Sequence, residues 1–138
     1  MKDYLQKSQK IKVTCIVRHG DKVLLLRSTE VANREHQPRG GYFDIPSFTV
    51  SFGEDPRATL ERTLESYLGE VIDTVSVLDV RQYMSDNQAT QVFDMLFTAE
   101  TINDVEIDER VGKFMFVAQS ELDVYMFPKE KIYLEKYL

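Results

Sequence analysis

The sequence predicts an α/β domain in which helices pack on a mixed β-sheet. Three observations lead to this prediction: β-rich segments stand on both sides of one well-capped helix, short helical segments close the chain, and the length suits one domain. With 138 residues, 43% of them apolar, the chain is long enough to bury a proper hydrophobic core. Eight Phe and seven Tyr are typical of a packed chain and exclude a disordered one. We therefore expect residues 1–138 to form a single domain.

The first part of the chain predicts a hairpin and then a long loop. Residues 11–18 and 22–27 are rich in β-branched and aliphatic residues, and His19-Gly20-Asp21 between them has the chemistry of a turn. Residues 28–40 are polar and predict a surface loop. Two short extended segments follow, at 42–46, where Pro46 ends the strand, and at 49–52.

The central helix has clear signals at both ends. Asp55 can accept hydrogen bonds from the free N–H groups of the first turn, and Pro56 suits the first helical position. Gly69 suits the C-terminal cap because glycine takes a positive φ without steric cost. Apolar residues recur at spacings of three and four, which predicts one buried face made of Leu60, Leu64, Tyr67, Leu68 and Val71.

The second part of the chain predicts another hairpin and two short helices. Residues 74–84 and 91–100 are β-rich, and the polar residues 85–88 between them predict a turn. An acidic loop over 102–110 precedes a last strand at 113–118. We expect Ser120 to cap a short helix that starts at Glu121, and Pro128 to open a terminal helix. The expected packing residues of the terminal helix are Ile132, Leu134, Tyr137 and Leu138.

Charge and cysteine content exclude several classes of protein. The formal net charge of −6 repels nucleic acid, although a locally basic pocket could still hold a small nucleotide. The single cysteine, Cys15, has no partner for an internal disulfide and lies in an apolar run, so we expect a buried thiol. The polar start MKDYLQKSQK is not a signal peptide, and no apolar run reaches membrane-spanning length. A cytoplasmic protein is the expectation.

The segment from Phe43 to Ile72 resembles the signature loop and helix of the Nudix, or MutT-like, hydrolases. The family pattern is Gly, five residues, Glu, seven residues, Arg-Glu, an aliphatic residue, any residue, Glu-Glu, any residue, Gly and an aliphatic residue. In this chain, the residues that match the pattern are Glu54, Arg62, Leu64 and Gly69. The residues that replace Gly, Glu, Glu and Glu of the pattern are Phe48, Thr63, Ser66 and Tyr67.

Features outside the signature extend the resemblance over residues 10–138. They are the LLLR end of the second strand, the tetrad Phe43-Asp44-Ile45-Pro46, and the late run KFMFVAQSELDVYMFP. The resemblance implies an α/β/α sandwich with a central mixed sheet. It also implies hydrolysis of a diphosphate linkage joined to a nucleoside, with Mg²⁺ or Mn²⁺ neutralising charge on the phosphate oxygens.

The residues that would hold this metal are replaced. In the family the helix glutamates are ligands of the cation, and Thr63, Ser66 and Tyr67 stand in their places. Hard divalent cations require oxygen ligands, mostly carboxylates, and a neutral hydroxyl is a weak substitute. Ser47 and Phe48 also replace the glycine pair that lets the family's backbone approach metal and phosphate. We therefore expect no metal cofactor at the standard site and impaired hydrolysis.

Six residues remain as candidates for a functional site. By resemblance, the catalytic candidates are Glu54, which borders the family's metal site, and Arg62, which orients a signature glutamate; here the two can also form a structural pair. The candidates for ligand binding are Arg27, Arg39, Phe48 and Glu70. A ligand pocket is expected between the sheet, the signature helix and the 28–40 loop.

Three functions are compatible with these residues. The favoured one is a Nudix-fold protein without metal-dependent hydrolysis that binds a nucleotide-like ligand or a partner protein. The second is an active hydrolase of a nucleoside diphosphate derivative, whose Mg²⁺ or Mn²⁺ site is displaced to Glu54, Glu70 and the loop acids Asp104, Glu106, Asp108 and Glu109. The third is a structural or dimerisation module. No nucleic-acid or membrane partner is expected, and a homodimer is one of the oligomeric states left open.

Overall fold

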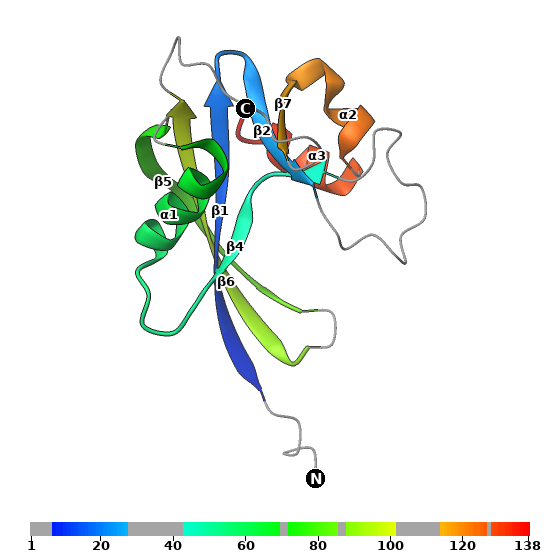
Figure 1. The fold of residues 1–138 in the computed structure, drawn as a ribbon. Coiled ribbons are helices and arrows are strands. Elements are labelled where there is room, and N and C mark those ends of the chain that lie inside the picture. Colours follow the sequence, from blue (N-terminus) through cyan, green and yellow to red (C-terminus); the bar gives the residue numbers. More distant parts are fainter. Residues whose placement is uncertain (1–6, 28–42, 70–71, 86–87, 102–113, 127) are drawn as a thin grey trace.

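One mixed sheet with helices on both faces forms the protein (Figure 1). The computed structural model describes residues 7–27, 43–69, 72–85, 88–101, 114–126 and 128–138. The strands are β1 (Ser8–His19), β2 (Lys22–Arg27), β3 (Phe43–Asp44), β4 (Ser47–Val50), β5 (Ile72–Met84), β6 (Thr90–Thr101) and β7 (Phe114–Ala118). The helices are α1 (Pro56–Leu68), the 3-10 turn η2 (Gln119–Glu121), α2 (Leu122–Tyr125) and α3 (Pro128–Glu135).

β1 is the central strand of the sheet. It runs parallel to β6, from the pair Ser8–Thr90 to the pair Arg18–Glu100, and antiparallel to β2 and β4. The order β3-β2-β1-β6-β5 places β3 and β5 at the two ends, while β4 pairs with β1 and β7 pairs with β2. The coexistence of parallel and antiparallel pairs confirms the predicted mixed sheet.

Two apolar clusters, one on each face of the sheet, form the core. Side chains alternate between the faces of a strand, so neighbouring residues of β1 belong to different clusters. On one face the cluster contains Val13, Cys15, Val17, Leu24, Phe97 and the α1 residues Leu60, Leu64 and Leu68. On the other face it contains Ile16, Leu25, Phe43, Leu96, Leu122, Met126 and the α3 residue Leu134. The two layers of helix confirm the α/β/α sandwich.

The predicted ends of α1 are present. The Asp55 carboxylate accepts a hydrogen bond of 2.9 Å from the Ala58 N–H, and Pro56 occupies the first turn. Gly69 has a φ of +72° and donates its N–H to the Glu65 carbonyl. Both predicted hairpins are also present, because β1 pairs antiparallel with β2 and β5 pairs antiparallel with β6. The burial of Cys15 is confirmed, with no exposed side-chain surface.

Three local predictions need correction. Ser120 lies inside η2 and caps neither η2 nor α2, since neither has a side-chain hydrogen bond at its N-terminus. In α3, Leu134 is buried as predicted, but Ile132 is 61% exposed and Tyr133 packs against the core instead. The second short strand was expected at 49–52, whereas β4 spans Ser47–Val50, because its pairing with β1 already begins at Ser47, opposite Thr14.

Some predictions concern residues that the structure does not describe. These are the 28–40 loop, Tyr42, Val71, part of the 85–88 turn and the acidic loop at 102–110. Among the described residues, no helix has the length and apolar character needed to cross a membrane.

Candidate functional site

The three positions at which the Nudix pattern has metal-binding glutamates lie on α1 and have structural contacts. The Thr63 hydroxyl donates to the Thr59 carbonyl at 2.7 Å, and the Ser66 hydroxyl donates to the Thr63 carbonyl at 2.5 Å. Such bonds tie short polar side chains to their own helix. The Tyr67 ring packs edge-on against Phe114, with ring centroids 6.3 Å apart. The contacts of these side chains are therefore with the helix backbone and the core.

Glu54 and Arg62 form the predicted pair. Arg62 Nη2 lies 2.5 Å from Glu54 Oε2, so the pair ties the loop before α1 to the helix. Hydrogen bonds from Arg62 and Ser51 lower the pKa of Glu54 below its usual value. The carboxylate is thus anionic at neutral pH, but its charge is already balanced by Arg62.

The residues at the signature positions do not fit the divalent cation that the Nudix resemblance implies. Glu54 is the one carboxylate of the matched signature, and it is paired with Arg62. Two of the three hydroxyl-bearing replacements bond to helix carbonyls. Across the described part of the chain, no three His, Cys, Asp or Glu residues come together in a metal-binding group.

Of the other predicted site residues, the structure describes Arg27 and Phe48, which lie on different strands, β2 and β4. Arg27 is exposed at the end of β2 and lies over the buried Phe43 ring, at 5.4 Å from its centroid. Phe48 is partly buried and packs against the core beneath α1. Arg39 and Glu70, together with the loop acids at 104–109, lie outside the described residues.

A cleft of about 790 Å³ lies on the face of the sheet opposite α1. It is lined by β1, β3, β4, β5, β6 and α3, and its lining includes Lys12, Thr14, Asp44, Ser47, Arg81, Tyr83, Asp94, Lys129, Glu130 and Tyr133. The pocket expected between the sheet, α1 and the 28–40 loop would lie on the α1 face, and part of its lining is outside the described residues. This cleft was not predicted from the sequence.

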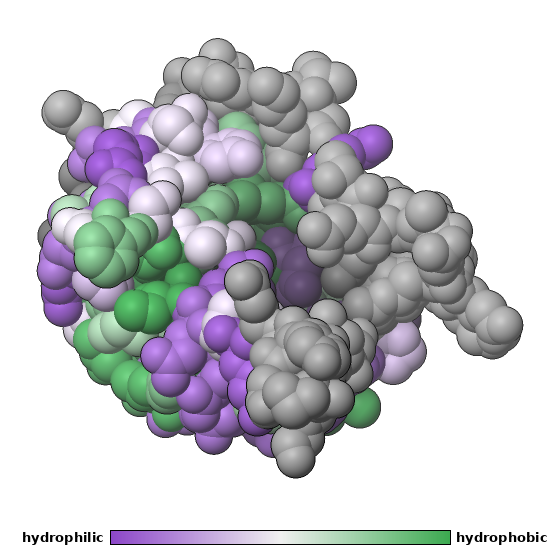
Figure 2. All heavy atoms as spheres, turned by 90° about the horizontal axis from the view of Figure 1, so that it is seen from below, coloured by the Kyte–Doolittle hydropathy of each residue, from purple (hydrophilic) through white to green (hydrophobic). Residues whose placement is uncertain are grey.

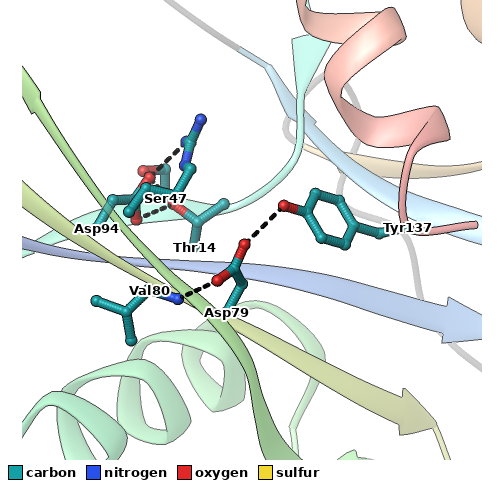
Figure 3. A network of polar contacts seen from close by, with 7 residues as sticks. Thr14, Ser47, Asp79, Val80, Asp94 and Tyr137 are labelled. Carbon is teal, nitrogen blue, oxygen red and sulfur yellow. Dashed lines mark hydrogen bonds and ion pairs between the residues drawn. The ribbon is translucent and has the colours of Figure 1, made fainter.

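A buried carboxylate organises the cleft (Figure 3). Asp94 is 1% exposed, and its two oxygens accept hydrogen bonds of 2.7 Å from the Thr14 hydroxyl and from Arg81 Nη2. The Thr14 hydroxyl also lies 3.0 Å from that of Ser47. β1, β4, β5 and β6 each contribute one residue to this network because the sheet register sets them side by side.

Aromatic rings hold the Arg81 guanidinium in place. Its Cζ lies 3.9 Å from the Tyr133 ring centroid and 5.6 Å from that of Tyr83. A guanidinium on an aromatic face gains cation–π attraction, which is larger where water is excluded. Burial raises the pKa of both tyrosines, so each phenol is neutral at neutral pH and can act as a hydrogen-bond donor.

Two donors in the cleft have no protein acceptor among the described residues. They are Arg81 Nε and the Tyr133 hydroxyl, and both atoms are buried. An unpaired buried donor costs about 1–3 kcal/mol, so such groups usually mark a bound water or ligand. One signal in the sequence pointed to this site: Asp94 interrupts the apolar run VFDMLF, where an unpaired carboxylate would be costly.

Comparison with known proteins gives similarity in structure alone. No family model and no curated protein sequence matches the chain. A NUDIX hydrolase from Nitrosomonas europaea superposes with a TM-score of 0.65 at 13% identity, over 94% of this chain and 88% of that one. A MutT NUDIX hydrolase from Burkholderia pseudomallei gives 0.64 at 16% identity, over 94% and 98%. The mutator MutT protein from Bacillus halodurans gives 0.61 at 20% identity, over 91% and 80%.

These structures share the mixed sheet and its helices with the present chain over most of their length. At such low identity the similarity concerns the backbone and does not extend to activity. It agrees with the resemblance carried by the capped signature helix and by the Glu54 and Arg62 spacing. The chain therefore has the fold of the Nudix hydrolases.

Proposed function

We propose that this Nudix-fold chain binds a nucleotide-like small molecule and does not carry out metal-dependent hydrolysis of a diphosphate. The observation that supports this proposal most directly is the state of α1. The hydroxyls of Thr63 and Ser66 donate hydrogen bonds to helix carbonyls, and the Tyr67 ring is packed against Phe114. A cation at this helix face would meet neutral hydroxyl oxygens, which cannot balance its charge.

The cleft supports the proposed binding of a nucleotide-like small molecule. Its two unsatisfied buried donors require acceptor atoms, which the carbonyl and ring nitrogen atoms of a nucleobase would supply. The Tyr133 and Tyr83 rings offer flat surfaces beside them, and Lys12 and Lys129 in the lining could meet a phosphate. A nucleotide combines a planar ring, acceptors and negative charge in one molecule.

Binding can be measured by calorimetry with nucleoside triphosphates, dinucleoside polyphosphates and ADP-ribose, without added metal. We expect at least one of these to bind, and Tyr133→Phe to weaken it by roughly three- to tenfold, since one hydrogen bond is lost. The matched control is Tyr125→Phe. The Tyr125 ring packs against Phe43, and Tyr125 is not part of the cleft lining.

A bound ligand must also stabilise the fold. At a concentration of about 100 times Kd, the free energy of unfolding should rise by about 2.7 kcal/mol. If no compound of the panel raises the melting temperature, the binding proposal fails and a purely structural role gains support.

The loss of hydrolysis is tested separately. The same panel with Mg²⁺ or Mn²⁺ should release no phosphate and no nucleoside monophosphate above background. Robust turnover that disappears in Glu54→Gln would show instead an active enzyme with a displaced metal site.

A further inference from the structure

The sheet continues beyond α1 and is exposed there. The leucines of α1 pack on a cluster that includes Val13, Cys15 and Val17 of β1. The next residues of β1 on this side, Ile11 and Gln9, are exposed. Figure 1 shows β1, β5 and β6 running on past the helix. Among the described elements, α1 therefore covers only part of this face of the sheet.

The uncovered part of this face has no charged side chain in its strand rows. The register aligns three rows there: Val13–Met95–Val80, Ile11–Phe93–Gln82 and Gln9–Gln91–Met84. On the opposite face, the same strands align the charged row Lys12–Asp94–Arg81 in the cleft. A sheet face in contact with water normally carries polar and charged residues, and 29% of this chain is charged. The absence of charge from these rows is therefore typical of a covered surface.

Five apolar side chains lie on and beside these rows. Val80 is 57% exposed, Ile11 43% and Met84 41%, and Phe93, beside Ile11, is partly exposed. Phe52 is fully exposed in the turn that leads from β4 to α1. We call these five residues the open face.

The open face is large for an exposed apolar surface. Figure 2 views the molecule from below and shows apolar residues gathered on its left side, which is the side of α1 in Figure 1. The five side chains expose on the order of 500 Å² of apolar surface. A patch of this size on a single chain usually marks an interaction site.

The side chains of the open face, and not the edge of β5, offer the contact surface. The Val80 N–H is bonded to Asp79 Oδ1 at 2.8 Å, so it is not available to another strand. The ladder between β5 and β6 is also irregular between Asp73 and Ser76 and between Val77 and Asp79. Such irregularities protect an edge strand from pairing with another chain. A partner must therefore pack on the face of the sheet.

We propose that a second copy of this chain covers the open face, so that two sheets pack face to face across a two-fold axis that runs across the strands. Packed sheets lie about 10 Å apart, and a helix with its side chains is about as thick. The sheet of the second copy therefore continues the layer that α1 begins. The axis places the α1 helix of each copy beyond the end of the other copy's open face.

A second copy fits this surface in area. A stable dimer needs about 800 Å² from each partner. The apolar surface of the open face comes close to this area together with the neighbouring Gln9, Gln82 and Gln91. Covering the glutamines is made easier because Gln9 Nε2 already donates to Gln91 Oε1 at 3.0 Å.

A second copy also fits this surface in charge. In a two-fold interface each open face meets itself, so an uncharged surface meets an uncharged surface. Two chains of net charge −6 can then associate without bringing like charges into direct contact. A charged partner surface would instead have to bury its charges where the rows offer no opposite charge.

Sedimentation equilibrium over a range of protein concentrations measures the oligomeric state. We expect the wild type to have twice the monomer mass and Val80→Lys to have the monomer mass, because the lysine would be buried without a partner. This lysine makes the chain less negative, so weaker association could not be due to stronger overall repulsion. The matched control, Ile132→Lys, changes an equally exposed side chain on α3, on the other face, and should remain dimeric.

Phe52→Ser tests the same interface without a risk to folding, because a fully exposed ring has little packing to lose in the monomer. It should weaken the dimer at least about tenfold, since two buried rings are lost from each dimer. For the wild type, added salt should leave the dimer intact or tighten it, because salt screens the repulsion between two acidic chains.

Four results would each overturn the proposal. They are a wild type that is monomeric at every concentration, folded Val80→Lys or Phe52→Ser variants as dimeric as the wild type, dissociation of the dimer by salt, and open-ended oligomers in place of a dimer.

Discussion

Asp94 is a buried carboxylate whose presence is not explained by stability alone. An ion pair such as Asp94–Arg81 gains attraction but loses hydration, and apolar residues of similar size often stabilise a core as well or better. The role of Asp94 is instead to position a neighbouring side chain. With Tyr133 it fixes the orientation of the Arg81 guanidinium, so that Nε is held in a defined place in the cleft. The network is therefore better suited to recognition than to stability.

The buried thiol of Cys15 makes the free energy of unfolding depend on pH. Burial raises the pKa of the Cys15 thiol to about 12, whereas an unfolded thiol ionises near ~8.5. The folded state thus binds the proton more tightly, and this contribution is complete below ~8.5 and declines as pH rises toward the folded pKa. Between about pH 8.5 and 9.5 the free energy of unfolding should fall by about 1 kcal/mol.

The comparison with Cys15→Ala isolates this effect. Urea unfolding of the variant should lack this decline, although the variant is less stable at every pH because it loses buried atoms. Equal pH dependence in the two proteins would mean that other groups are responsible.

At the scale of elements, α1 and the hairpins could be predicted because their signals are local. Asp55, Pro56 and Gly69 each lie within one turn of the helix end that they define. The short C-terminal elements had weaker signals. Ser120 has the right chemistry for a cap, but the chain leaves β7 directly into η2, so Ser120 lies inside a turn. Ile132 is exposed because the register of α3 turns Leu134 toward the core.

The cap of α1 can be tested by removing its carboxylate. Asp55→Ala should lower the free energy of unfolding by about 1 kcal/mol, because the Ala58 N–H loses its acceptor. Asp55→Asn retains an acceptor and should cost much less. The control Glu65→Ala removes a carboxylate from the exposed side of the same helix and should stay within about 0.5 kcal/mol of wild type. Equal effects of Asp55→Ala and Glu65→Ala would contradict the capping role.

At the scale of the whole molecule, the fold could be predicted but the cleft could not. The resemblance to Nudix hydrolases depends on a contiguous signature, which the sequence displays directly. The cleft instead joins Thr14 to Asp94 across 80 positions and adds a residue from α3. Which strands become neighbours depends on the parallel pairing of β1 with β6, and no local pattern encodes that pairing. In the sequence, Asp94 within an apolar run indicates a buried polar site, but it does not identify the partners of that carboxylate.

The capped helix α1 of the Nudix-like fold should allow a metal site to be rebuilt. Thr63→Glu combined with Ser66→Glu would place two carboxylates on one flank of the helix, in addition to Glu54. Tyr67 is left in place because its ring packs against Phe114 and the core. We expect the double variant to bind Mn²⁺ with a Kd on the order of 1 mM or tighter, as weak carboxylate sites do. Wild type should show no binding in the same calorimetric titration.

The matched control is Thr63→Gln combined with Ser66→Gln, which adds the same bulk without charge. It should bind no Mn²⁺, because an amide cannot balance the charge of the cation. If the glutamate variant folds but binds no better than the glutamine variant, the backbone geometry of a metal site has been lost together with its ligands. If wild type itself binds Mn²⁺ tightly, the hydroxyls on α1 do not prevent metal binding. The position of the metal, rather than its absence, would then distinguish this chain from the hydrolases that share its fold.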